Sequence, residues 1–175
     1  MKTKTLSIAT LLTVILSANT AFAAPVTASD RLRETADRIG AEKFTARNYH
    51  PGLIRHIVLF RYADSVTAKQ KEEVKARFLA LKDLCRRSGK RYVVSIETGA
   101  QSSGEGVDQN LEQGFIVTFR SEGDRNFYVG KDIVKDERFI DPAHDEFKKF
   151  VGSLLHEPVN PTGVLVFDFA VEAPL

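Results

Sequence analysis

The chain has 175 residues, of which 25 are Lys or Arg and 23 are Asp or Glu. This length suits a single domain that is large enough to bury a hydrophobic core. The charges nearly balance and there is no Trp, which argues against the net basic surface of a nucleic-acid-binding domain.

Residues 1–23 are typical of a bacterial secretory signal peptide. Lys2 and Lys4 give a positive start, residues 6–18 are mostly apolar, and Ala21 to Ala23 (AFA) form a cleavage site. The apolar run is shorter than the roughly 20 residues that span a bilayer. We therefore predict cleavage after Ala23, a periplasmic or secreted protein, and no membrane anchor. Removal of the two Lys leaves 23 basic and 23 acidic residues, so no nucleic-acid partner is expected.

Residues 24–52 are predicted to form a helical extension and a linker. Ser29 or Asp30 can cap a helix that carries a weak apolar stripe of Leu32, Ala36 and Ile39. Pro51 and Gly52 then end the segment. The helix can pack on the domain or on a partner subunit. An exposed stripe would favour a role as an interaction module in the cell envelope.

The main domain is predicted to span residues 53–175 and to open with a strand at residues 53–62 that is apolar at its centre. Thr67 and Gln70 form a capping box for a helix that runs to about Arg87. The apolar face of this helix consists of Val74, Phe78, Leu81 and Cys85. The chain has no second cysteine for an intrachain disulfide, so we interpret Cys85 as a core residue.

The rest of the domain is predicted to contain three more strands and further helical segments. In chain order these are a strand at 92–98, a polar Gly-rich loop at 99–109, a strand at 114–120, a helical region from Ser121, a charged run at 131–138, a helix from Pro142, and a strand at 164–171. The order β-α-β-β-α-β predicts an α+β fold of the ferredoxin-like type. Right-handed crossovers place both helices on one face of the sheet.

The other face of the sheet has no predicted cover, although the strands are apolar on both faces. An exposed apolar surface of this kind usually marks an interface. A second copy that packs its sheet against the first is the simplest solution, so we predict a homodimer.

Several segments occur together in a recognisable order and spacing: Arg55 to Phe60, Thr67 to Glu73, the region of Tyr128, Pro142 to His144, and Phe167 to Phe169. In these segments the sequence resembles the stress-responsive A/B barrel (Dabb) family of dimeric α+β barrels. The resemblance covers residues 53–171 and implies a dimeric α/β barrel. Membership of this family does not by itself imply a reaction.

A plant polyketide cyclase of that family supplies candidate site residues. The resemblance implies a catalytic pair at Tyr128 and His144, and a pocket lined by His56 and Phe78. Residues 131–140 are an insertion between the two members of the pair, and they can also gate the pocket. The helix N-terminus favours a neutral His144, which can then act as a general base while Tyr128 polarises a carbonyl group.

Asp168 is the one charged residue of the last strand. Since that strand pairs antiparallel with the first in this fold, we predict a contact between Asp168 and His56, with a structural role or a role in tuning a ligand pocket. Separation of the two side chains by more than about 8 Å would contradict it, because hydrogen bonds need about 3 Å. The four His residues show no metal-binding spacing, so neither a metal nor a cofactor is predicted.

Three functions stay open at this point. We favour an exported dimeric protein that binds a small hydrophobic or aromatic molecule without catalysis. The alternative is a cofactor-independent enzyme, like a polyketide cyclase or a monooxygenase, that uses Tyr128 and His144. The third is the interaction module described above. A closed apolar pocket that contains Tyr128, His144 and His56 would favour the enzyme, and a filled pocket would favour the first function.

Overall fold

The computed structural model describes residues 26–156 and 163–172. The predicted signal peptide lies outside the described residues. The centre of the structure is an antiparallel sheet with strand order β4-β5-β1-β6. Its strands are β1 (Pro51–Phe60), β4 (Ser95–Ala100), β5 (Gln113–Ser121) and β6 (Val164–Ala170).

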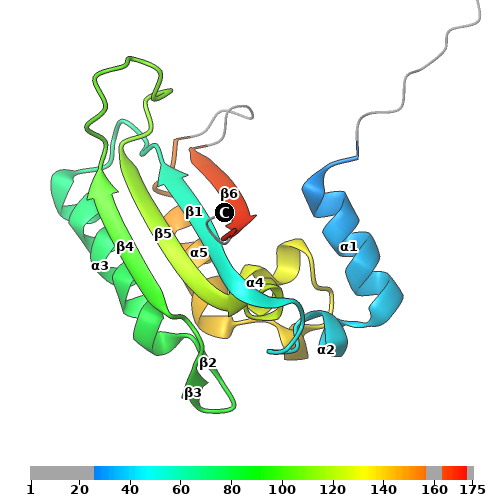
Figure 1. Cartoon of the computed structure of the whole chain (residues 1–175). Coiled ribbons are helices and arrows are strands. Elements are labelled where there is room, and N and C mark those ends of the chain that lie inside the picture. The colour runs from blue at the N-terminus through cyan, green and yellow to red at the C-terminus, as the bar shows by residue number, and fades with distance from the viewer. Residues whose placement is uncertain (1–25, 157–162, 173–175) are drawn as a thin grey trace, which may run out of the picture.

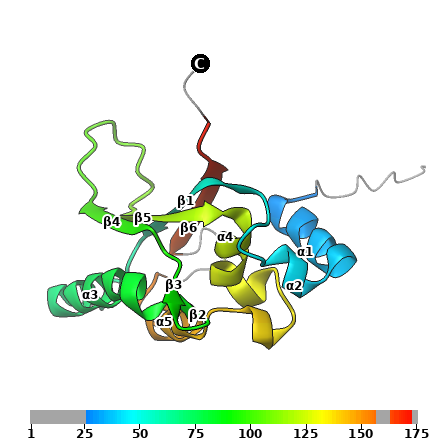
Figure 2. The ribbon, with the colours of Figure 1, turned by 60° about the horizontal axis from the view of Figure 1, so that its bottom comes forward.

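Helices α3 (Ala68–Leu84) and α5 (Pro142–Gly152) lie side by side on one face of this sheet (Figure 2). The chain order β1-α3-β4-β5-α5-β6 confirms the predicted α+β, ferredoxin-like fold. The predicted capping box starts α3, since the Thr67 hydroxyl accepts from the Gln70 N–H and the Gln70 side chain accepts from the Thr67 N–H.

The first helix of the domain is shorter than predicted. It ends at Leu84, and Cys85 is its C-terminal cap. A small hairpin follows, with β2 (Arg86–Arg87) and β3 (Lys90–Arg91) joined through Ser88 and Gly89, both at positive φ. A two-residue turn with two positive φ angles matches the twist of the strands in a hairpin. The hairpin therefore starts at Arg86, where the sequence analysis predicted a continuing helix.

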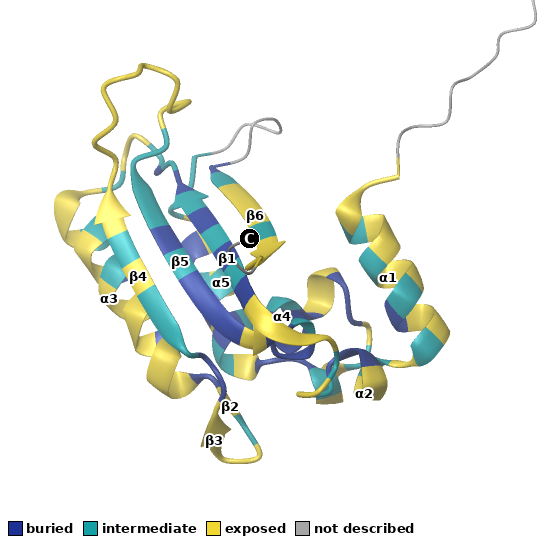
Figure 3. Cartoon of the chain, viewed as in Figure 1, coloured by how far each residue is buried: buried dark blue, intermediate teal, exposed yellow. Residues whose placement is uncertain are grey.

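The core lies between the sheet and its two helices. From α3, Val74, Phe78 and Leu81 point inward, and the ring of Phe78 stacks on Phe115 of β5 with centroids 3.9 Å apart. Every second residue of β1 from Ile54 to Phe60 is buried on this side. The central strands β1 and β5 are accordingly the most buried part of the sheet (Figure 3).

The opposite face of the sheet is uncovered among the described residues (Figures 2 and 3). Its apolar side chains include Leu165, Phe167 and Phe169 of β6, and Phe167 is 60% exposed. In the register of β6 on β1, Phe167 lies beside Ile57 and Leu165 beside Leu59, so the exposed apolar side chains form one continuous face.

A second, smaller core joins the N-terminal extension to the predicted insertion. The chain here forms α1 (Ala28–Ile39), α2 (Ala41–Phe44), α4 (Glu122–Val129) and the 3-10 turns η1 (Gly130–Asp132) and η2 (Glu137–Phe139). Ala36 of α1 is buried with Phe44, Ile133, Val134 and Ile140, while Leu32 and Ile39 pack against this group. The apolar stripe of the extension is therefore used within the chain, which weighs against the interaction-module function.

The cap of α1 is Thr27, two residues before the predicted Ser29. The Thr27 hydroxyl accepts from the Asp30 N–H, and the Asp30 carboxylate accepts from the Thr27 N–H. Asp30 is therefore the third helical residue of a capping box and not the cap itself.

None of the helices within residues 26–156 and 163–172 combines the length and the apolar character that crossing a membrane requires.

Candidate functional site

A cavity of about 990 Å³ lies between the helix-facing side of β1 and β6, helix α5 and helix α1. Most of its lining is apolar, with Val58, Phe60, Phe78, Phe147, Val151, Leu155, Val164 and Val166. Four of the predicted site residues also line it: His56, Phe78, His144 and Asp168. The cavity is open to solvent beside β6, where Val166 is 53% exposed.

Two other hollows contain none of the predicted site residues. One, of about 1010 Å³, is lined mainly by charged side chains near the β2–β3 hairpin. The other, of about 720 Å³, lies on the uncovered sheet face beneath the loop at 101–112. The chemistry-bearing residues therefore point to the first cavity as the candidate site.

His144 is placed by the start of α5. Asp141 is the N-terminal cap, and its Oδ1 accepts from the Ala143 and His144 N–H groups at 2.8 and 3.0 Å. The His144 Nδ1 lies 2.6 Å from the Tyr128 carbonyl oxygen. Since a carbonyl only accepts, Nδ1 must carry the proton and Nε2 the lone pair. The ring is thus a hydrogen-bond acceptor at the cavity wall.

The neutral form of His144 was predicted from the helix N-terminus, but burial is the larger cause. Burial lowers the pKa of His144 to about 3, against the hydrogen bond to the Tyr128 carbonyl, which acts to raise it. The imidazole is therefore uncharged over the whole physiological pH range.

Tyr128 lies directly behind His144. The two rings stack with centroids 3.7 Å apart, so the structure brings the predicted pair together despite the insertion. Tyr128 is 1% exposed and does not line the cavity, and its hydroxyl has no hydrogen-bond partner among the described residues. Burial, and to a lesser extent nearby Cys85 and Asp141, raise the pKa of Tyr128 well above its usual value. The hydroxyl is neutral, and it does not line the candidate site.

His56 and Asp168 are direct neighbours in the pairing of β1 with β6. The His56 Nδ1 lies 2.7 Å from the Asp168 Oδ1, which confirms the predicted contact. Arg125 of α4 donates from Nη1 to the Asp168 Oδ2 at 2.5 Å. Burial acts to raise the pKa of Asp168, but the hydrogen bonds and charges of His56 and Arg125 outweigh it and lower that pKa. The Asp168 carboxylate is thus ionised and accepts hydrogen bonds from both His56 and Arg125.

Arg125 is a site residue that the sequence analysis missed. It occupies a short helix between Asp124 and Asn126, and no spacing rule links it to an acid 43 positions later. Arg125 is recognisable as a site residue because its charge is buried, and burial cannot be read from the sequence alone.

Phe78 contributes an aromatic wall. Besides its stack on Phe115, it meets the Phe147 ring edge-on with centroids 5.1 Å apart. Both Phe78 and Phe147 line the cavity, so this part of the lining suits an apolar or aromatic body.

Two expectations concern residues outside the cavity. Cys85 is fully buried, as predicted, and burial raises the pKa of its thiol far above the usual range. Within residues 26–156 and 163–172, no three His, Cys, Asp or Glu side chains are grouped so that they could hold a metal ion.

The fold matches those of several solved proteins. A protein from Arabidopsis thaliana superposes with a TM-score of 0.55 at 22% identity, covering 70% of this chain and 98% of that one. A hydroxynitrile lyase from Passiflora edulis gives 0.55 at 17%, covering 71% and 98%. A dimeric ferredoxin-like protein of unknown function from Jannaschia sp. CCS1 gives 0.52 at 17%, covering 69% and 100%. At these identities the likeness shows the fold alone.

A comparison with functionally curated proteins gives no significant match. The sequence profile of the stress-responsive A/B barrel domain, in contrast, matches residues 54–171, which is more than half of the chain and includes every strand of the main sheet except the first residues of β1. The chain therefore belongs to the stress-responsive A/B barrel domain family.

Proposed function

We propose that this protein is an exported homodimer that binds a small hydrophobic or aromatic molecule in the cavity between β1, β6, α5 and α1. The observation that carries the proposal is the lining, which is mostly apolar and also holds polar groups, among them His56, His144 and Asp168. Ligand sites typically have this composition and volumes of about 300–1,000 Å³.

The polar groups favour binding over proton transfer. A general base is most effective when its pKa lies near the working pH, and burial lowers the pKa of His144 to about 3. The Nε2 lone pair of His144 is better suited to accept a hydrogen bond from a ligand hydroxyl or amide group. The neutral ring thereby orients a ligand in a mostly apolar cavity.

The homodimer is supported by the uncovered sheet face. Leu165, Phe167 and Phe169 are exposed along one side of the edge strand β6. Exposed apolar faces of this kind mark interaction surfaces, and the structurally similar protein from Jannaschia sp. CCS1 is described as dimeric. Export rests on the sequence of residues 1–23.

Native mass spectrometry of the protein purified from the periplasm of its host tests dimer and export together. The expected species is a dimer of residues 24–175. A monomer would contradict the dimer, and a mass that includes residues 1–23 would contradict cleavage.

Isothermal titration with N-phenyl-1-naphthylamine, a neutral aromatic probe, tests the cavity. The probe is expected to bind the native protein and to lose affinity in Val166→Trp, because the larger ring fills the open side of the cavity. Val107→Trp adds the same side chain to an exposed loop position outside the cavity and serves as the control. Equal binding by both variants would contradict the site, as would the absence of binding to the native protein.

A cofactor-independent enzyme, similar to a polyketide cyclase or a monooxygenase, is the second candidate. The stack of Tyr128 on His144 favours it, since the pair is held together. Tyr128→Phe separates the two functions. If the pair is catalytic, the native protein converts aromatic or polyketide-like substrates and Tyr128→Phe does not. The binding function predicts that the variant keeps its affinity for the neutral probe, because the hydroxyl does not line the cavity.

A further inference from the structure

One wall of the cavity comes from outside the matched family domain. The family match begins at residue 54, whereas α1 spans Ala28–Ile39. Five residues of α1 nevertheless line the cavity: Ala28, Ser29, Arg31, Leu32 and Thr35. In Figure 1, α1 stands across from the edge strand β6, and the cavity lies between them.

This wall is fixed to the body of the protein. Besides the second core, the Lys135 Nζ donates to both Asp37 carboxylate oxygens at 2.9 and 2.7 Å, and the Arg33 Nε donates to the Asp132 carbonyl at 2.8 Å. Segment 130–140, the predicted insertion, is therefore the support of α1. Helix α1, which precedes the family match, and segment 130–140, which supports it, together form this wall of the cavity.

The acidic groups of the lining all have basic partners. Glu122 is bound to His50 at 3.0 Å, Asp132 to Lys148 at 2.9 Å, and Asp168 to His56 and Arg125. Lys148 and Arg125 thus neutralise Asp132 and Asp168, which reduces the negative charge that would repel an anionic ligand.

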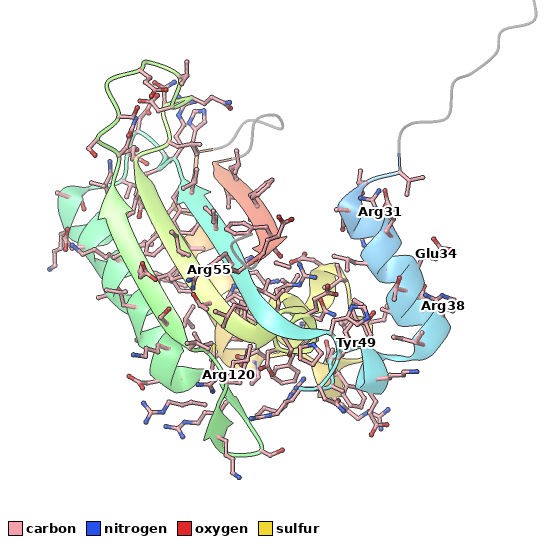
Figure 4. The ribbon with its side chains drawn as sticks, in the orientation of Figure 1. Arg31, Glu34, Arg38, Tyr49, Arg55 and Arg120 are labelled. Atoms are coloured by element: carbon pink, nitrogen blue, oxygen red, sulfur yellow. The ribbon has the colours of Figure 1, made fainter. Side chains whose placement is uncertain are left out.

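Arg31 differs from the other lining cations. Its Nη1 donates to the Val26 carbonyl at 2.9 Å, and it has no carboxylate partner among the described residues. Figure 4 labels Arg31 near the start of α1, before Glu34 and Arg38, and of these three residues only Arg31 lines the cavity. A positive charge with no carboxylate partner among the described residues thus lines this mostly apolar cavity.

We propose that α1 is a specificity-determining wall and that Arg31 forms an ion pair with the anionic end of an elongated apolar ligand. The body of the ligand lies among the aromatic side chains, and its anionic group reaches the Arg31 guanidinium, whose planar donors suit a carboxylate, sulfonate or phosphate. The inference rests on the proposed binding function and adds the charge class of the ligand.

Two probes with the same aromatic body test it. N-phenyl-1-naphthylamine is neutral, and 8-anilino-1-naphthalenesulfonate carries one sulfonate on the same skeleton. In the full-length mature protein, Arg31→Gln is expected to weaken the sulfonate probe about two- to fivefold, the range for an exposed ion pair, and to leave the neutral probe unchanged. Arg38→Gln removes an equal charge from a residue of α1 that does not line the cavity, and it should change neither affinity.

The outcomes separate the two proposals. Failure of the neutral probe to bind the native protein would overturn the binding function itself. Binding of the neutral probe, combined with a sulfonate affinity that Arg31→Gln and Arg38→Gln alter equally or not at all, would overturn the role of Arg31 alone. Sulfonate binding that Val166→Trp does not reduce would place that probe outside the cavity and would also overturn this role.

Discussion

Replacement of Asp168 by Asn is expected to destabilise the fold, because Asp168 joins three elements. It lies on β6, and its carboxylate binds His56 of β1 at 2.7 Å and Arg125 of α4 at 2.5 Å. Asn keeps the shape but replaces one acceptor oxygen by a donor. Arg125, whose side chain is 9% exposed, then loses its counter-charge in a buried position.

The magnitude follows from the burial of the group. Removal of one partner from a fully buried ion pair costs about 3–5 kcal/mol. Because the Asp168 side chain is 20% exposed, solvent screening reduces this to about 2–4 kcal/mol. The pKa of Asp168 is lower in the folded protein than its ordinary value of 3.8. The contribution is therefore fully present above about pH 4 and disappears as the pH falls through the folded pKa.

Urea unfolding of the native protein and of Asp168→Asn, at pH 7 and at a series of lower pH values, measures both effects. Asp83→Asn is the control, since Asp83 pairs with Arg91 on the surface and should contribute about 0–1 kcal/mol. Equal losses in the two variants at pH 7 would refute the reasoning. A stability difference that grows as the pH falls below 4 would refute the assignment of the ionised form.

Three further predictions concern burial. Gly123→Ala would place a Cβ 1.8 Å from the Ala46 carbonyl oxygen, so thermal unfolding should show a stability loss of about 3 kcal/mol. Gly99→Ala is the control, because a Cβ there meets open space, and similar stability losses in both variants would contradict the contact. The His144 ring should stay neutral, with its proton on Nδ1, from pH 7 to about pH 4 in NMR titration, because burial lowers its pKa to about 3. Since the unfolded chain takes up that proton near pH 6.5, His144 should reduce stability as the pH falls below this value; a folded midpoint near 6.5 would contradict both statements. The Cys85 thiol should react with a thiol reagent only after unfolding, and rapid reaction in the native protein would contradict its burial.

Local signals predicted the elements of the fold well. The Thr67–Gln70 capping box and the proline at the start of α5 lie where the sequence placed them. The predicted second strand, 92–98, was less accurate, because β4 begins at Ser95. Tyr92 and Val93 are apolar and β-forming, but they are buried ahead of the strand, where the Tyr92 hydroxyl donates to Asp141 at 2.6 Å. A tertiary contact here overrides local strand propensity.

From residue patterns alone, the candidate site was predictable only where strand pairing determines it, whereas Phe78 and His144 followed from the family resemblance. The contact of His56 with Asp168 follows from two antiparallel neighbours in the sheet. Arg125 and the α1 wall could not be predicted, since each depends on how a helix packs against distant segments. Tyr128 and His144 meet although residues 131–140 lie between them, because that segment forms the turns η1 and η2 and packs with α1, which no sequence pattern indicates.

The central claim is that a ligand occupies the cavity between β1, β6 and α5. The most direct measurement is an isotope-filtered NOE experiment on the labelled mature protein with unlabelled N-phenyl-1-naphthylamine. We predict NOEs from the probe to Phe78, His144 and Val166, which line the cavity. NOEs confined to Leu165 and Phe169 on the open sheet face, with none to Phe78 or His144, would contradict the claim.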